Sequence, residues 1–184
     1  MIYLILDAAA GNRTMWQTKS LEQIIYIDME KKLTVKPTIF CNNTNTPFLD
    51  GTFTDIFYDP PHFFGDKSSF YAIPDQKTFL KKWQGYGDIP RYYGGDKYKN
   101  QMQLLSHIYK AQKEFQRILK HDGLLWLKWN ETMIKLGTIM HLFEDWAPLL
   151  QIPVRLSNPN RTQKQTYWVC LCLKKAKTKQ TQLI

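Results

Sequence analysis

The residues best suited to chemistry lie in one short stretch, Asp55-Ile-Phe-Tyr-Asp59-Pro-Pro-His62. A strand-forming run ends here at an acid and two prolines. Because proline has no N–H and a nearly fixed φ, neither a strand nor a helix continues freely past this point. The carboxylate of Asp59 and the carbonyl of Pro60 are both acceptors, which suits a ligand with two donors, such as an exocyclic amino group. His62 offers a flat face on which a base could stack.

The stretch resembles the D-P-P-[YFW] motif of amino-directed, S-adenosylmethionine-dependent methyltransferases, with Asp59, Pro60, Pro61 and His62 as the four catalytic positions. The resemblance implies that a flipped base presents its amino group to Asp59 and Pro60 while His62 stacks on the ring. Since histidine titrates near neutral pH, we expect activity to fall as His62 protonates. The alternative is an ordinary strand-to-loop turn, because D-P and P-P are common in loops.

Four predicted strands each end in polar side chains. The strands cover 2–6, 24–27, 36–40 and the run to Tyr58, and the residues that follow are Asp7, Asp28, the pair Asn42 and Asn43, and Asp59. In an open α/β sheet, ligands bind outside the carboxyl ends of the strands. We therefore expect these side chains to surround one site.

A loop of small residues, 8–12, follows the first strand and would let a ligand approach the backbone closely. It resembles the first methyltransferase motif, D-x-[FG]-x-G-x-G, with Ala9 and Gly11 in the first two small positions and Arg13 in place of the third glycine. A purely structural turn is the alternative. The resemblance implies S-adenosylmethionine as cofactor, held by Asp7, Ala8, Ala9, Ala10, Gly11, Asn12, Asp28, Met29, Glu30, Asn42, Asn43 and Asp59.

Two parts of the cofactor have specific candidates. Asp28 lies about twenty residues beyond the small-residue loop, the spacing that ribose recognition needs, and Glu30 is the second choice. A surface acid at a strand end is the alternative for Asp28. By the resemblance, Asn42 or Asn43 would recognise the adenine, because an amide can both donate and accept.

The composition favours a polyanionic partner. The chain of 184 residues has a formal net charge of +9 and a pI of about 9.4, which favours binding to phosphates. Its length fits one domain, 1–184, with a basic tail at 174–184. The segment 63–98 is predicted to be a substrate-facing insertion or lid, or else a loop whose aromatic residues cap the core. Its substrate-binding candidates are Phe63, Phe64, Arg91, Tyr92, Tyr93 and Lys97.

The second half of the chain completes an α/β pattern. Apolar spacing predicts a helix over 100–120 closed by Asp122-Gly123, a strand over 124–129, a helix from Asn130 to about Trp146, and strands over 151–156 and 166–173. With the methyltransferase resemblance, this predicts a single Rossmann-like class I domain. Its sheet would have seven strands, mostly parallel with one antiparallel, and helices on both faces.

Other features narrow the setting. The three cysteines and four histidines lack the spacing typical of metal ligands, so we expect no metal site. The apolar run at the start of the sequence is too short to predict a membrane span. A cytoplasmic protein is the simplest expectation. The absence of G-x-G-x-x-G after the first strand disfavours a nicotinamide-dependent dehydrogenase.

The resemblance implies methylation of an exocyclic amino group in nucleic acid, with N6-adenine or N4-cytosine of DNA favoured. One alternative is amino methylation of ribosomal, transfer or messenger RNA. The other is a non-catalytic, methyltransferase-like subunit that only binds nucleic acid. Because only the 63–98 segment could serve target recognition, a partner subunit is a further expectation.

Overall fold

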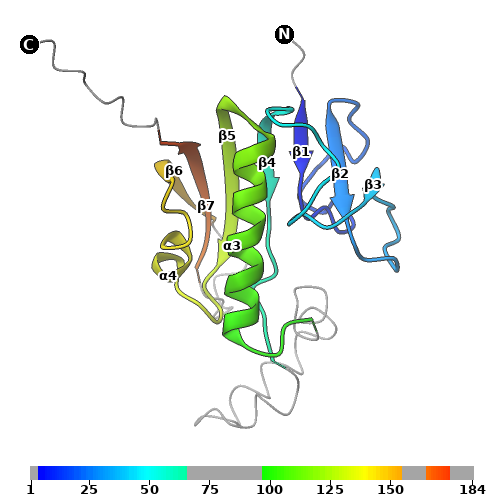
Figure 1. Ribbon diagram of the computed structural model, residues 1–184. Helices are drawn as coiled ribbons and strands as arrows, with labels where there is room; N and C mark the ends of the chain where they lie inside the picture. The colour runs from blue at the N-terminus through cyan, green and yellow to red at the C-terminus, as the bar shows by residue number, and fades with distance from the viewer. Residues whose placement is uncertain (1–3, 66–96, 155–164, 175–184) are drawn as a thin grey trace, which may run out of the picture.

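A computed structural model describes residues 4–65, 97–154 and 165–174. The strands in these ranges are β1 (Ile5–Asp7), β2 (Ile24–Asp28), β3 (Ile39–Phe40), β4 (Phe53–Tyr58), β5 (Leu119–Asn130), β6 (Trp146–Val154) and β7 (Thr166–Leu173). The helices are α3 (Gln101–Ile118) and α4 (Leu136–Met140). The strands form one sheet in the order β3-β2-β1-β4-β5-β7-β6 (Figure 1).

The sheet is mostly parallel. Strands β3, β2, β1, β4 and β5 pair in parallel, whereas β7 pairs antiparallel with both β5 and β6. The predicted seven-stranded sheet with one antiparallel strand is thus confirmed. The strand order reverses between β1 and β4, and this reversal is where open α/β sheets bind ligands.

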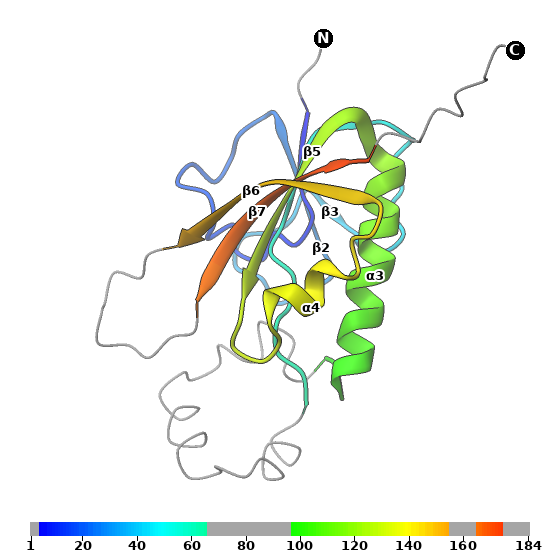
Figure 2. The same cartoon turned by 90° about the vertical axis from the view of Figure 1, so that its left-hand side faces the viewer.

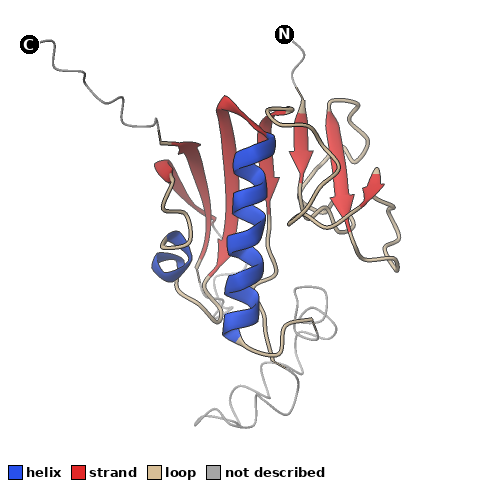
Figure 3. Cartoon of the chain, in the orientation of Figure 1, coloured by secondary structure: helices blue, strands red, loops and turns tan. Residues whose placement is uncertain are grey.

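One face of the sheet carries the main core. Helix α3 is capped by Asn100, whose side chain accepts from the Gln103 N–H, and its apolar side packs across the central strands (Figure 3). The rings of Tyr58 and Phe115 lie 4.9 Å apart, edge to face. Ile139 of α4 belongs to the same buried cluster. Both described helices therefore cover the same face.

The opposite face has no described helix. The connections 8–23 and 29–38 are built of turns and bends (Figure 2), so the described residues supply helices on one face rather than on both. Trp16 of the first connection packs edge to face on Phe57, at 5.0 Å, and Phe57 lies parallel to Trp126, at 5.8 Å. Aromatic side chains therefore pack on this face of the sheet, where no helix is described.

Several element boundaries differ from the prediction, and the third strand, predicted over 36–40, is only Ile39–Phe40. Helix α3 ends at Ile118 and β5 begins at once, so Asp122-Gly123 lies inside the strand rather than closing the helix. Glycine at 123 has a steric reason, because a Cβ there would lie 2.7 Å from both the Thr54 carbonyl oxygen and Leu119 Cδ1. The helix predicted from Asn130 to Trp146 shrinks to the five residues of α4, and β6 starts at Trp146, before the predicted 151.

Most of the predicted insertion and tail lies outside the described residues, namely 66–96 and 175–184. Among the described residues, no helix is long and apolar enough to cross a membrane.

Candidate cofactor cavity and acidic site

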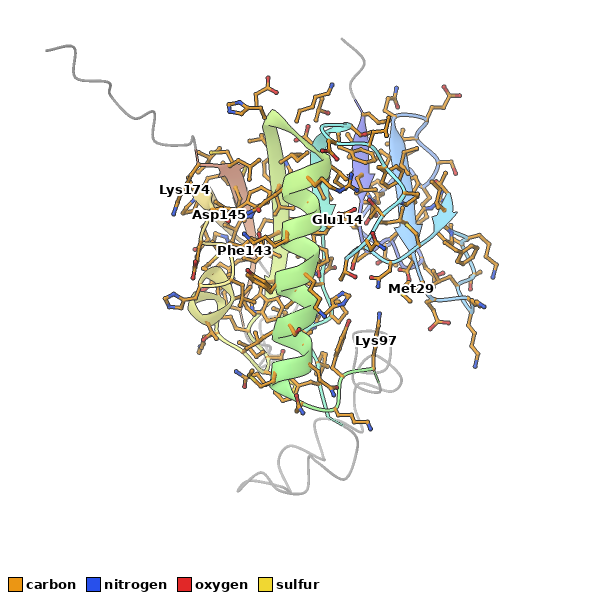
Figure 4. All side chains as sticks on the ribbon, in the orientation of Figure 1. Met29, Lys97, Glu114, Phe143, Asp145 and Lys174 are labelled. Atoms are coloured by element: carbon orange, nitrogen blue, oxygen red, sulfur yellow. The ribbon has the colours of Figure 1, made fainter. Side chains whose placement is uncertain are left out.

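A cavity of about 530 Å³ opens at the carboxyl ends of β1 to β4. Its lining combines most of the predicted cofactor residues with several others: Ala8, Ala9, Ala10, Gly11, Asn12, Thr14, Met15, Asp28, Met29, Glu30, Leu33, Cys41, Asn43, Asp59, Pro61, Lys97 and His107. Figure 4 labels two of them, Met29 after β2 and Lys97 before α3.

Hydrogen bonds and a cation–π contact fix the conformation of the small-residue loop. Gly11 has φ of 50°, a left-handed conformation that favours glycine, and its N–H donates to Asp28 Oδ2 at 2.8 Å. Arg13 is also left-handed, with φ of 54°. Its guanidinium lies 3.8 Å from the centre of the Tyr26 ring and donates to the carbonyls of Lys19 and Lys36. The arginine in the third glycine position therefore braces the loop and does not line the cavity.

The acids after β2 line the cavity. Asp28 Oδ1 accepts from the Glu30 N–H at 2.8 Å, so each of its carboxylate oxygens already takes one backbone donor. A carboxylate oxygen has room for a second donor, so Asp28 can still accept from ligand hydroxyl groups. Asn12 supports the same wall, because its side-chain oxygen accepts from the N–H groups of Thr34 and Val35.

The structure separates the two candidate asparagines. Asn43 lines the cavity and donates from Nδ2 to the Ala8 carbonyl at 2.9 Å. Its Oδ1 is buried and has no hydrogen-bond partner among the described residues. Asn42 instead accepts from the Thr44 N–H and does not line the cavity. Of the two asparagines, Asn43 is therefore the one whose side-chain oxygen accepts no hydrogen bond from the described residues. A buried carbonyl oxygen without a donor costs free energy.

Asp59 stands at the end of β4 and pairs with a residue that the sequence analysis did not single out. Lys128 of β5 lies 2.6 Å from Asp59 Oδ2, and the two side chains are 28% and 15% exposed. The signal for Lys128 was a single charge in the apolar strand Leu-Leu-Trp-Leu-Lys-Trp-Asn. Only the pairing of β4 with β5 brings it to Asp59.

His62 lies in the core rather than along the cavity. Its ring packs 4.8 Å from Phe63 and 6.3 Å from Trp129, and neither His62, Phe63 nor Phe64 lines the cavity. Burial lowers the pKa of His62 to about 4, against the opposing effects of the Asp59 charge and a hydrogen bond with the Pro60 backbone. The imidazole is therefore neutral near pH 7, and its protonation falls well below the range in which we expected activity to respond.

Asp7 is fully buried behind the loop, where its carboxylate accepts from Trp16 Nε1 at 2.7 Å and from the Ala9 N–H at 3.3 Å. Burial raises the pKa of Asp7 to about 6, although both hydrogen bonds act to lower it. Asp7 does not line the cavity. Its contacts shape the loop that does.

The predicted substrate-binding residues do not all lie in the described part of the chain. Lys97 lines the cavity, whereas Arg91, Tyr92 and Tyr93 lie outside the described residues. His107 of α3 also lines the cavity, and burial together with Lys97 and Lys110 lowers its pKa to about 4. The prediction missed His107 because it treated α3 as packing alone. In the described ranges, no group of three or more His, Cys, Asp or Glu residues is arranged to hold a metal ion.

Comparisons with known proteins bear on the fold. No protein-family model matches the sequence, and no curated protein matches it. Three similar solved structures are a TehB-like SAM-dependent methyltransferase from Corynebacterium glutamicum (TM-score 0.54, 11% identity, 94% of this chain and 81% of that one), the PH0226 protein from Pyrococcus horikoshii (0.56, 11%, 92% and 81%) and a SAM-dependent methyltransferase from Leishmania major (0.55, 10%, 93% and 65%).

Because the sequence identities are so low, these similarities establish the fold alone. The chain has the Rossmann-like fold of class I methyltransferases, as the sequence analysis predicted.

Proposed function

We propose that this protein is an S-adenosylmethionine-dependent methyltransferase that acts on an exocyclic amino group of a nucleic-acid base. The observation that carries the proposal is the order of groups along one cavity. Asn43 follows β3, Asp28 ends β2, the loop 8–11 follows β1, and Asp59 follows β4. The strands are adjacent in that order, so an elongated ligand would meet these groups in turn.

The polar groups that line the cavity fit S-adenosylmethionine. Asn43 lines the cavity and would contact the adenine, and Asp28 would accept from the ribose hydroxyls. The lining carries three carboxylates, Asp28, Glu30 and Asp59, and one lysine, Lys97, while Lys128 offsets the charge of Asp59, so one negative charge remains in excess. That excess of negative charge suits a ligand with a sulfonium and an ammonium group and a single carboxylate.

S-adenosylmethionine, when bound, supplies an electrophilic methyl group on a sulfonium ion. Asp59 would accept one amino hydrogen of the target and orient the nitrogen lone pair towards that methyl group. The target nitrogen would form the new carbon–nitrogen bond as the carbon–sulfur bond of the cofactor breaks. It then loses one proton, which Asp59 can take and pass to water.

The nucleic-acid substrate is supported by charge and by the loop after β4. The net charge of +9 favours a polyanion, and the Asp59-Pro-Pro sequence resembles that of amino-directed enzymes. DNA at N6 of adenine or N4 of cytosine is the favoured target, with amino groups of RNA as the second candidate. Recognition would draw on a partner subunit if the described chain alone does not select a sequence.

The proposal is tested by transfer of labelled methyl from S-adenosylmethionine to unmethylated genomic DNA and, separately, to unmodified total RNA. The test variant is Asp59→Asn, and exposed Asp122→Asn is the matched control. We expect label on DNA with the wild type and Asp122→Asn and at least a hundredfold less with Asp59→Asn. Label only on RNA would select the second candidate. Cofactor binding without label on either polymer would point to a missing partner subunit or a different substrate, whereas neither label nor cofactor binding would favour the non-catalytic subunit.

A further inference from the structure

The ion pair between Asp59 and Lys128 is built into the sheet. Strands β4 and β5 are parallel neighbours, and Tyr58 pairs with Leu127. Asp59 directly follows Tyr58 and Lys128 directly follows Leu127, so the register of the two strands places Asp59 beside Lys128. Neighbouring strands lie about 4.8 Å apart, which brings such a pair of side chains together. The 2.6 Å contact therefore comes from backbone pairing, not from a chance meeting of surface side chains.

The surroundings shield this pair from water. Lys128 lies opposite Trp168 of β7 in the antiparallel ladder, and both members of the pair are less than one-third exposed. Ion pairs partly removed from water interact more strongly than exposed ones and are screened less by salt. The neighbouring imidazole of His62 is neutral near pH 7, because burial lowers its pKa to about 4. Among the described residues, Lys128 therefore offsets the charge of Asp59 at this end of the cavity.

We propose that Lys128 is a positioning residue for the methyl transfer described above. It holds Asp59 Oδ2, leaves Oδ1 for an amino hydrogen of the target, and offsets the carboxylate charge. The proposal rests on the proposed function. It narrows the substrate to a neutral, planar amino group, such as that of a base, because an alkylammonium ion would be better bound by an unpaired carboxylate.

The charge at this end of the cavity can be measured without a methyl acceptor. S-adenosylmethionine carries a positive sulfonium where S-adenosylhomocysteine has a neutral thioether, so the ratio of their dissociation constants reports local charge. Lys128→Met leaves Asp59 uncompensated and is expected to increase the preference for S-adenosylmethionine by roughly threefold to tenfold. Lys128→Arg keeps the charge and should give the wild-type ratio. Lys174→Met, at an exposed position just after β7, is the matched control.

The experiment is calorimetric titration of both ligands into the wild type and each variant, with thermal unfolding to confirm that each variant is folded. Lys128→Gln provides a second neutral variant if Lys128→Met does not fold. A folded neutral variant with an unchanged ratio would overturn the role of Lys128, as would an equal change in Lys128→Arg. A folded wild type that binds neither ligand would refute the proposed function itself, which is a separate result.

Discussion

At the scale of single residues, the structure changes the meaning of two residues in the predicted site. His62 and Arg13 occupy positions where the motif has an aromatic residue and a glycine. His62 packs against Phe63 and Trp129, and Arg13 braces the loop over Tyr26. Neither departure reaches the cavity lining. They are therefore adaptations of the scaffold and do not argue against cofactor binding.

The buried imidazole of His62 should make stability depend on pH. Its pKa falls from 6.5 to about 4 on folding, so the unfolded chain binds more protons between these values. Stability from this residue is present above pH 6.5 and is lost as pH falls towards 4. In denaturant unfolding, the wild type should lose about 2 kcal/mol more than His62→Phe between pH 7 and pH 5.

The buried carboxyl of Asp7 titrates in the opposite sense, because its pKa is raised to about 6, but its contribution cancels in the comparison of wild type with His62→Phe. Replacing the exposed His121 by phenylalanine is the control. Parallel pH curves for wild type and His62→Phe would show that the imidazole is not held neutral by burial.

At the scale of elements, the junction between α3 and β5 depends on one glycine. A methyl group on Gly123 would lie 2.7 Å from the Thr54 carbonyl oxygen, and that oxygen belongs to the neighbouring strand β4. We expect Gly123→Ala to lower the free energy of unfolding by about 1–3 kcal/mol.

Gly137→Ala in α4 is the matched control. A Cβ at Gly137 meets no atom within 4 Å, and alanine favours a helix over glycine by about 1 kcal/mol. The two variants should therefore shift the urea midpoint in opposite directions. Equal midpoints would mean that the helix-to-strand junction can relax around the added methyl group.

The sequence predicted some elements well and others poorly for identifiable reasons. Strand β7 matches its prediction residue for residue, because a short apolar run with aromatic residues between polar segments has few alternatives. The helix predicted after Asn130 failed because its apolar residues serve two elements, with Leu136 and Ile139 in α4 and Trp146 opening β6.

At the scale of the whole molecule, the sheet order converts residues far apart in sequence into one cavity. The sequence could predict that Asp28, Asn43 and Asp59 follow strands, and hence that they share an edge of the sheet. It could not predict which asparagine faces inward, nor that Lys128 joins Asp59, because both depend on strand pairing and side-chain packing.

The central claim is that this cavity binds S-adenosylmethionine with its adenine at Asn43. It is tested most directly by calorimetric titration of the cofactor into the wild type, Asn43→Ala and the neighbouring Asn42→Ala. We predict saturable binding to the wild type, at least tenfold weaker binding to Asn43→Ala, and nearly unchanged binding to Asn42→Ala, because Asn43 lines the cavity and Asn42 does not. A folded wild type without binding, or equal affinities for wild type and Asn43→Ala, would contradict the account.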